Sequence, residues 1–351
     1  MNERILVVAP SWVGDAILSE PLIARLRDVY ADAAIDVLAP PWCGPVYARM
    51  RGVRDVIANP VGHGRLGLRG RAALARALRS RPPQDRYTRA FVLPNSWKSA
   101  LLPWLAAIPI RTGYRGEARW GLLTDLRPLG RPAPPRLVDR FVALAEERGA
   151  PVPAASLPLL VADAANRAAA VQALGLGGDR PVAALCVGAE FGPAKRWPAE
   201  HFAALAARFI ADGLRVWLIG SPNDLPAAQA VVAAAAGLEP PALVNLAGAT
   251  DLGTAIDLLS LAAVVVANDS GLMHAAAAVG VPLVALFGSS SPAYTPPLSS
   301  RAEIAKIDIA CSPCFKRECP LGHFRCMREI DPGAVYDLSR TVEENATARP
   351  R

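Results

Sequence analysis

The stretch Ala267-Asn268-Asp269-Ser270-Gly271-Leu272-Met273-His274 decides the fold of this chain. The three valines before it are typical of a buried strand, and the apolar pattern after it predicts a helix that ends at Gly280. Asp269 or Ser270 is the expected N-cap of that helix. A strand that turns directly into a helix points free N–H groups at the space above the sheet, where anions and diphosphates bind. Taken alone, the stretch also fits an ordinary capped helix.

The same alternation of strand and helix occurs in both halves of the chain. The first half opens with strand Ile5–Ala9, and a helix followed by strand Ile35–Ala39 completes a βαβ unit with a parallel sheet. The proline-rich stretch Pro151–Pro158 is the expected linker. The sequence predicts two doubly wound α/β domains, 1–158 and 159–335, and a C-terminal helix or tail at 336–351. In the second domain, strands are expected at 182–187, 216–219, 264–267 and 283–287, with helices beginning at 199 and after 226.

Five further segments have clear local signals. We expect a strand at Phe91–Leu93, a basic loop and helix at Asn59–Pro83, and a helix at Leu137–Arg148. The segment Arg127–Pro135 holds too many prolines for a helix or a central strand, so it is predicted to be an irregular connector. The polar end Glu343–Arg351 is expected to be frayed.

Composition and charge restrict the class of protein. Hydrophobic residues make up 52% of the 351 residues, yet no apolar run reaches the roughly 18 residues that a membrane-spanning helix needs. The first strand follows the N-terminus without a signal-peptide pattern, so we expect a cytoplasmic protein with reduced cysteines.

The net charge is +7, but the segment from Arg49 to Arg140 carries +14 and the rest −7. This asymmetry favours an anionic partner: nucleic acid, an anionic membrane surface or a phosphorylated substrate. Arginine enrichment from a GC-rich genome is the alternative explanation, and no nucleic-acid-binding motif is present.

A loop with small residues and two cations follows the first strand of the second half. This loop, Gly188–Pro198, contains Lys195 and Arg196, which could neutralise a diphosphate. The sequence has no P-loop pattern, no Gly-x-Gly-x-x-Gly after the first strand of either half, and no Gly-x-Ser-x-Gly. These absences argue against an ATPase, a dehydrogenase and an α/β-hydrolase. No Asp-x-Asp pair could hold a metal on a diphosphate, so Lys195 and a helix N-terminus are expected to carry the charge.

Six blocks of the chain, in order from about residue 5 to 298, resemble the ADP-heptose:lipopolysaccharide heptosyltransferases. They are Ser11–Asp15, Pro94–Ala100, Arg111–Gly113, Gly188–Pro198, Asn268–His274 and Ser289–Pro297. The resemblance implies a GT-B fold, in which two Rossmann-like domains face each other across a cleft. It also implies that the first domain binds the acceptor and the second the sugar nucleotide. The implied activity is an inverting transfer of L-glycero-D-manno-heptose to the inner core of lipopolysaccharide.

The resemblance assigns roles to residues at matching positions. Asp15 matches the family's general base and Lys195 the lysine that contacts the donor phosphates, so these two are the predicted catalytic residues. Asp269 matches an acidic residue that holds heptose hydroxyls. His274 matches a donor-site histidine, although a structural role is the alternative, and from the residues alone Asp15 also suits a helix N-cap. The other predicted donor-binding residues are Ser11, Gly14, Arg196, Ser270, Gly271, Leu272 and, for the ribose, Asp224. The predicted acceptor contacts are Asn95, Lys98, Arg115 and Arg119.

Four cysteines lie close together near the C-terminus, in the spacing Cys311-x2-Cys314-x4-Cys319-x6-Cys326. Four thiolates on a short loop can hold Zn²⁺ tetrahedrally, and an iron–sulfur cluster is the second metal interpretation. Free thiols or a disulfide staple would fit the same spacing. Any such metal is expected to be structural, and no cofactor is expected to be required for catalysis.

The resulting hypothesis is an inverting glycosyltransferase that moves heptose from ADP-heptose to heptosyl-Kdo2-lipid A. Its acceptor would be a phosphorylated glycolipid, so we expect a cytoplasmic protein peripherally associated with the inner membrane, and no nucleic acid partner. A family member with another acceptor is the first alternative. A non-catalytic protein that binds a nucleotide or an anionic lipid is the second.

Overall fold

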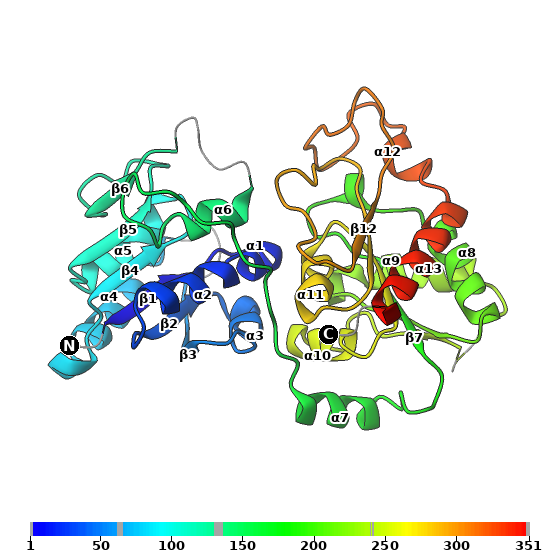
Figure 1. The fold of residues 1–351 in the computed structure, drawn as a ribbon, viewed down its shortest axis with the longest axis horizontal. Coiled ribbons are helices and arrows are strands. Elements are labelled where there is room, and N and C mark those ends of the chain that lie inside the picture. Colours follow the sequence, from blue (N-terminus) through cyan, green and yellow to red (C-terminus); the bar gives the residue numbers. More distant parts are fainter. Residues whose placement is uncertain (1–2, 62–65, 130–135, 239, 241, 349–351) are drawn as a thin grey trace. The chain divides into compact units, whose positions relative to one another are not determined.

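The computed structural model describes residues 3–61, 66–129, 136–238, 240 and 242–348. The chain forms two units, Met1–Leu159 and Leu160–Arg351, and in each of them helices flank a six-stranded parallel sheet (Figure 1). Residues 62–65 of the predicted basic loop and 130–135 of the predicted connector lie outside the described residues.

Unit 1 has the strand order β3-β2-β1-β4-β5-β6. Its strands are β1 Arg4–Val8, β2 Ala34–Ala39, β3 Val53–Ala58, β4 Arg89–Val92, β5 Ile110–Tyr114 and β6 Asp125–Arg127. Its α-helices are α1 Val13–Leu18, α2 Glu20–Val29, α3 Gly44–Tyr47, α4 Leu68–Arg79, α5 Trp97–Leu105 and α6 Leu137–Val142, and its short 3₁₀ turns are η1 Pro41–Cys43 and η2 Pro83–Asp85.

Unit 2 repeats the same topology with the order β12-β11-β10-β7-β8-β9. Its strands are β7 Val182–Cys186, β8 Arg215–Leu218, β9 Leu243–Asn245, β10 Val264–Asn268, β11 Leu283–Leu286 and β12 Ala302–Ala305. Its α-helices are α7 Ala164–Ala173, α8 Ala199–Ala211, α9 Leu225–Ala234, α10 Leu252–Leu259, α11 Gly271–Val279, α12 Arg325–Arg328 and α13 Pro332–Ala348, with 3₁₀ turns η3 Pro193–Lys195 and η4 Pro222–Asp224.

The order of strands fixes where a ligand can bind in each unit. In both sheets the chain begins at the centre, builds outward on one side, and then returns to build the other side. The direction changes between β1 and β4 in unit 1 and between β7 and β10 in unit 2. Loops at the carboxyl ends of two such strands diverge, and the crevice that they leave is the usual ligand site of doubly wound folds.

The central strands are apolar runs because helices cover both faces of the sheet. Every residue of β7 and β10 is buried. Alternate residues, Ala183 and Leu185 on β7 and Val264 and Val266 on β10, belong to the same core cluster as Phe202, Phe209 and Trp197. This rigid base matters for function, because it fixes the strand ends from which the site loops extend.

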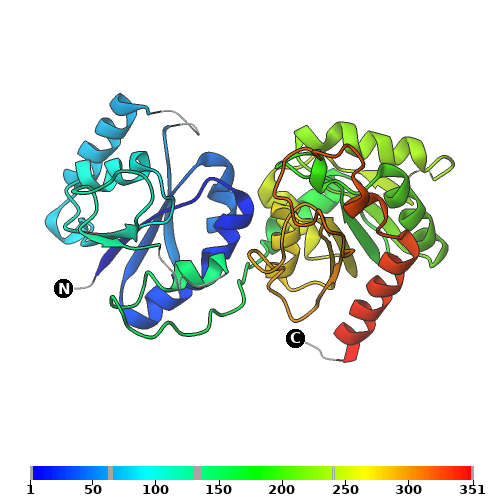
Figure 2. The ribbon, with the colours of Figure 1, turned by 90° about the horizontal axis from the view of Figure 1, so that it is seen from above.

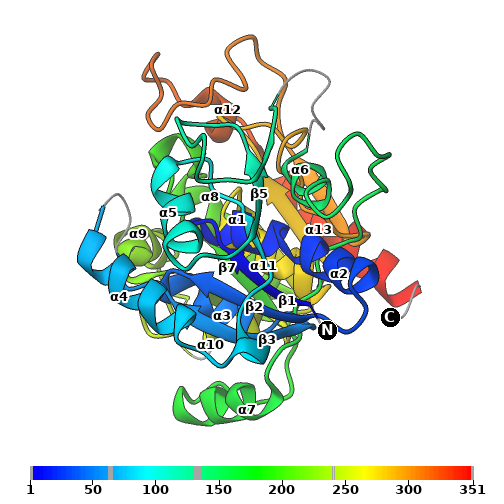
Figure 3. The ribbon, with the colours of Figure 1, turned by 90° about the vertical axis from the view of Figure 1, so that its left-hand side faces the viewer.

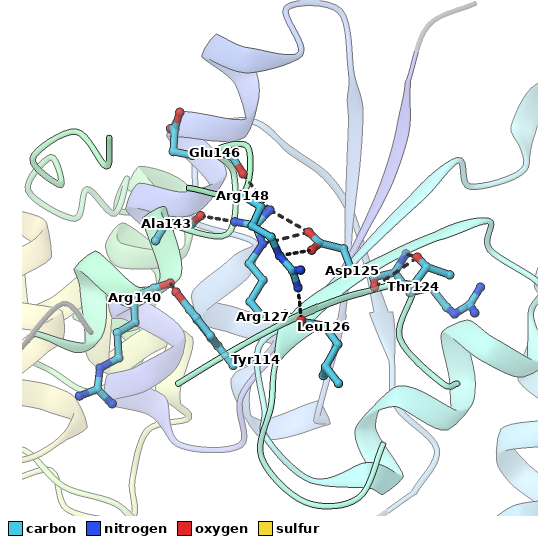
Figure 4. A network of polar contacts seen from close by, with 10 residues as sticks. Tyr114, Thr124, Asp125, Leu126, Arg127, Arg140, Ala143, Glu146 and Arg148 are labelled. Carbon is cyan, nitrogen blue, oxygen red and sulfur yellow. Dashed lines mark hydrogen bonds and ion pairs between the residues drawn. The ribbon is translucent and has the colours of Figure 1, made fainter. Parts of the chain in front are cut away.

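A network of polar contacts in unit 1 closes the edge of its sheet (Figure 4). Arg127 on β6 donates to the carbonyl oxygens of Ala143 and Glu146 at 2.6 and 2.7 Å and pairs with Asp125 at 2.8 Å. The Tyr114 hydroxyl donates to the Arg140 carbonyl oxygen at 2.7 Å. Part of the positive charge of this half is therefore used inside the unit and does not face a partner.

Three segments differ from the sequence prediction. The expected helix Leu137–Arg148 ends at Val142, because Arg127 binds the carbonyl groups that follow. The helix expected after the first loop is broken at Ser19 into α1 and α2. The frayed end predicted from Glu343 is wrong as far as Ala348, because α13 continues to that residue and packs against α8 and β10 to β12, with Val335 and Val342 buried (Figure 2). Residues 349–351 of the predicted frayed end lie outside the described residues.

Candidate functional site

The carboxylate of Asp15 lies at the carboxyl edge of the unit 1 sheet, in the first turn of α1. Trp12, not Asp15, occupies the N-cap position, so the capping interpretation of Asp15 is wrong. The loop before it is held by η1: Trp42 Nε1 and Cys43 Sγ both donate to the Ser11 carbonyl oxygen, at 2.8 and 3.6 Å. Burial, with the Asp15 charge as a second cause, raises the pKa of Cys43 to about 12. The thiol beside Asp15 therefore stays neutral at physiological pH.

The predicted acceptor residues come from the same edge, because β4 lies next to β1. Asn95 lies in the loop after β4, and Lys98 is in the first turn of α5. Arg115 is exposed just after β5, with its guanidinium 5.5 Å from the centre of the Trp120 ring. These polar and cationic groups therefore follow β4 and β5 at the same carboxyl edge of the sheet as Asp15.

Arg119 is buried, with only 1% of it exposed, whereas a residue that contacts the acceptor should be accessible. Its guanidinium donates to the carbonyl oxygens of Pro94, at 2.6 Å, and of Tyr114. It also reaches Asn95 Oδ1 at 3.4 Å, and burial lowers its pKa to about 10. Its position argues against the predicted role: Arg119 clamps the loop after β4, and its guanidinium is not exposed to an acceptor. Burial against carbonyl groups is a property that the sequence does not reveal.

The helix N-terminus that the sequence predicts is present in unit 2. Ser270 is the N-cap of α11, and its hydroxyl accepts from the Met273 N–H, so of the two proposed caps Ser270 is correct. Gly280 ends the helix in the left-handed region, with φ +75°. Gly271 and Leu272 form the first turn, whose N–H groups have no partner within the helix.

An ion pair joins two of the predicted donor-site residues of unit 2, Lys195 and Asp269. Lys195 Nζ binds the carboxylate of Asp269, and the Ser290 hydroxyl donates to the same oxygen. The pair connects the loop after β7 with the end of β10, which are 74 residues apart. His274, one turn into α11, is buried, and burial lowers its pKa to about 4. It is therefore neutral at physiological pH, so Lys195 supplies the positive charge next to this helix end.

Asn268 fixes the geometry of that pair from within the sheet. It is fully buried at the end of β10. Its amide donates to the Val187 carbonyl oxygen at 2.8 Å, and its Oδ1 accepts from the Trp197 N–H at 3.1 Å. One side chain thus holds both ends of the loop that carries Lys195.

Replacing Asn268 by alanine should destabilise unit 2 by about 2–4 kcal/mol, because a buried carbonyl and a buried N–H both lose their partners. Urea denaturation followed by circular dichroism would measure this. Asn223→Ala is the matched control, since that exposed amide makes only long contacts with Glu190 at 3.3 and 3.4 Å, and its effect should stay within about 0.5 kcal/mol. Equal midpoints for the two variants would contradict the role given to Asn268.

The carboxylate of Asp224 lies beside the loop after β7. Its Oδ2 accepts from the Ser221 N–H and hydroxyl, at 3.0 and 2.7 Å, whereas its buried Oδ1 has no partner among the described residues. A Cβ on Gly188 would lie 2.1 Å from the Asp224 carboxyl carbon, so only glycine allows this approach. Buried acceptors normally find a donor, and a ligand hydroxyl would supply one. Arg196 Nε is likewise buried without a partner among the described residues.

Comparison with known proteins decides the family. The model of "Glycosyltransferase family 9 (heptosyltransferase)" matches residues 71–325. The chain belongs to glycosyltransferase family 9. It is 43% identical over 340 residues to lipopolysaccharide heptosyltransferase 2 of Escherichia coli K12, covering 95% of this chain and 97% of the relative. It is 44% identical to lipooligosaccharide heptosyltransferase 2 of Haemophilus influenzae, covering 87% and 88%. The solved structure of E. coli ADP-heptose lps heptosyltransferase II matches with a TM-score of 0.86 and 40% identity, over 98% and 99% of the two chains. The predicted GT-B fold and the resemblance to this family are confirmed.

The four clustered cysteines of this family 9 chain do not form a recognisable metal site. They are free thiols, and burial, followed by the nearby Cys314, Cys311 and Cys319, raises the pKa of Cys326. Yet within the described part of the chain, no three His, Cys, Asp or Glu side chains are arranged so that they could hold a metal ion. The zinc and iron–sulfur interpretations therefore do not fit this arrangement of the thiols.

The structure of this family 9 chain places the predicted site residues in two groups. Lys195, Asp269, His274 and the start of α11 lie together in unit 2. Arg196 follows Lys195 on the same loop, and Asp224 lies on a neighbouring loop. Ser11, Gly14, Asp15, Asn95 and Lys98 share the edge of unit 1. Sequence reasoning missed the roles of Asn268 and Ser290, although each lies within a block that carries the family resemblance.

Proposed function

We propose that this chain is a lipopolysaccharide heptosyltransferase of the second type. It transfers L-glycero-D-manno-heptose from ADP-heptose to heptosyl-Kdo2-lipid A and inverts the anomeric centre. The observation that carries the proposal is the similarity over nearly the whole chain to relatives named heptosyltransferase 2. The site supports it, because a carboxylate lies at one switch point and a cation beside a helix N-terminus at the other.

The proposed reaction is a single displacement. The acceptor oxygen bonds to the anomeric carbon of the heptose, its proton passes to Asp15, and the bond to the donor phosphate breaks. Lys195 and the N–H groups of Ser270, Gly271 and Leu272 take up the charge of the departing ADP. Asp269 holds heptose hydroxyls, and the free Oδ1 of Asp224 is assigned to the ribose. No metal enters this proposal.

In this proposal, residues of unit 1 bind the acceptor. Lys98 and Arg115 are assigned to phosphates of the glycolipid, and Asn95 to its sugars. Arg119 acts indirectly, by holding the loop that presents Asn95.

A transfer assay with ADP-heptose and defined truncated lipopolysaccharides tests this function. Transfer is expected to an acceptor that ends in one heptose on Kdo. Transfer only to a heptose-free Kdo acceptor, or only to a longer core, would instead assign a different activity within the family. Binding of ADP-heptose without transfer to any of these acceptors would favour a non-catalytic binding protein.

We also propose that the protein works at the cytoplasmic surface of the inner membrane. In the described part of the chain, no helix is both long and apolar enough to cross a bilayer. Helix α4, which packs beside α5, offers a surface for peripheral attachment (Figure 3). Arg69, Arg76 and Arg79 on α4 are exposed and pair with no described residue, and Leu68 at its start is 55% exposed. Basic helices with exposed apolar groups bind anionic lipid surfaces.

Replacing Arg69, Arg76 and Arg79 by glutamine should weaken binding to vesicles that contain anionic lipid by roughly 100-fold at low salt. Co-sedimentation with phosphatidylglycerol-containing vesicles at rising salt measures this. A control with the same loss of charge on unit 2 (Arg180, Lys306 and Arg340 to glutamine) should bind nearly as wild type. Binding that is insensitive to both salt and the α4 substitutions would refute the α4 surface.

A further inference from the structure

The segment Cys311–Cys326, here called the cysteine-rich segment, packs on two loops of the proposed donor site. The Ser312 hydroxyl donates to the Gly288 carbonyl oxygen at 2.7 Å, and the Phe315 N–H donates to the Ser289 carbonyl oxygen at 2.6 Å. These two contacts lie next to Ser290, which binds Asp269. The segment is therefore anchored beside the carboxylate of the Lys195–Asp269 pair.

A third contact fixes the segment to the loop that carries Lys195. The Ala194 N–H donates to the Arg317 carbonyl oxygen at 3.0 Å. Gly192 makes this approach feasible: its φ is +152°, and a Cβ there would lie 2.5 Å from the Arg317 carbonyl oxygen. The backbone of Arg317 is thus held against the turn η3, whose last residue is Lys195.

The side chain of Arg317 also lies near Lys195, because both residues contact the ring of Phe191. Its guanidinium carbon lies 5.3 Å from the centre of the Phe191 ring, and Lys195 Nζ lies 5.0 Å from the centre of that ring. One aromatic ring therefore gathers two cations. Lys195 has Asp269 as its counter-ion, whereas Arg317 forms no ion pair with any described residue. Two neighbouring like charges repel each other, so an anion that lies between them would be favoured.

We infer that Arg317 is a second cation for the diphosphate of the donor, in addition to Lys195. The inference rests on the proposed function, which supplies a nucleotide diphosphate sugar as the ligand. A guanidinium can donate two parallel hydrogen bonds to one phosphate group, which a lysine cannot. With no metal in the proposed reaction, a second cation offsets charge that one lysine leaves uncompensated. The cysteine-rich segment then has a function, because it positions this cation.

The inference is tested by measuring the affinity of Arg317→Gln for ADP, AMP and adenosine by calorimetry or competition. The loss of a charge-assisted contact should weaken ADP binding roughly 10- to 100-fold, with little change for adenosine. Arg317→Lys should recover part of the loss, because it keeps the charge. Lys316→Gln is the matched control: it removes a neighbouring exposed charge with no described partner and should bind ADP as wild type.

Two results would overturn the inference. Unchanged ADP affinity in Arg317→Gln would show that the guanidinium does not reach the phosphates. An equal loss for ADP and adenosine in a thermally stable Arg317→Gln preparation, or no recovery in Arg317→Lys, would mean that the side chain only packs the segment. Failure of the wild-type chain to bind ADP would instead overturn the proposed function, and this inference with it.

Discussion

Replacing Asp15 by asparagine is expected to lower kcat by about 10³-fold while leaving the affinity for ADP-heptose almost unchanged. An acceptor hydroxyl is a poor nucleophile until a base takes its proton, and Asp15 is the group assigned to that step. The amide has the same shape, so the loop held by Trp42 and Cys43 should keep its conformation. ADP release at saturating donor and acceptor gives kcat, and calorimetry with ADP-heptose gives the affinity.

The control for this variant is Asp28→Asn, which removes an exposed carboxylate on α2 that has only a distant pairing with Arg25, at 3.9 Å. It should turn over as wild type. The pH profile adds a second readout, because the acidic limb of kcat/KM should be lost in Asp15→Asn if this group is the base. Turnover like that of the wild type in Asp15→Asn would remove Asp15 from the mechanism.

Lys195→Gln should lower kcat by about 10²–10³-fold and also weaken binding of the donor. Both kcat and donor affinity should fall, because the lysine neutralises the diphosphate of the bound donor and interacts more strongly with it as ADP leaves. Steady-state kinetics with ADP-heptose and ADP calorimetry separate the two contributions. Lys195→Arg should retain more donor affinity than Lys195→Gln, because it keeps the charge.

Loss of Lys195 also leaves the buried carboxylate of Asp269 with Ser290 as its only described side-chain partner. A thermal melt must therefore accompany the kinetics, to distinguish a folded, inactive variant from an unfolded one. Lys306→Gln serves as the control, because its pairing with Asp308 lies on the surface. Unimpaired transfer by a folded Lys195→Gln would exclude this lysine from stabilising the leaving group.

Much of the fold can be predicted because the two sheets are covered on both faces. Buried parallel strands such as β7 and β10 appear in the sequence as unbroken apolar runs, and glycines and prolines mark their ends. The half-exposed edge strand β3 lacks that signal, and the pattern does not predict it. Beyond Glu343 the polar residues of α13 are typical of a frayed tail, although the helix continues. Its few buried residues, such as Val342, reveal their role only when β10 to β12 are in place.

In the candidate site, too, some features can be predicted from the sequence and others cannot. The placement of residues that follow a strand, such as Asp15 and Asp269, can be predicted because topology alone brings strand ends to one edge, whereas the roles assigned to them stay predictions. Contacts between distant loops cannot, and the pairing of Lys195 with Asp269 is of this kind. Arg119 shows the reverse error: as one arginine among many in a basic segment it is predicted to contact a ligand, but carbonyl groups of its own unit surround it.

The pairing of Lys195 with Asp269 has a consequence for turnover. In the proposed cycle the lysine turns to the phosphates and the carboxylate to the sugar. Once the heptose has gone, Asp269 has no hydroxyls to hold and competes with the spent nucleotide for Lys195. In that cycle the carboxylate would hasten the exit of ADP and would limit inhibition by this product.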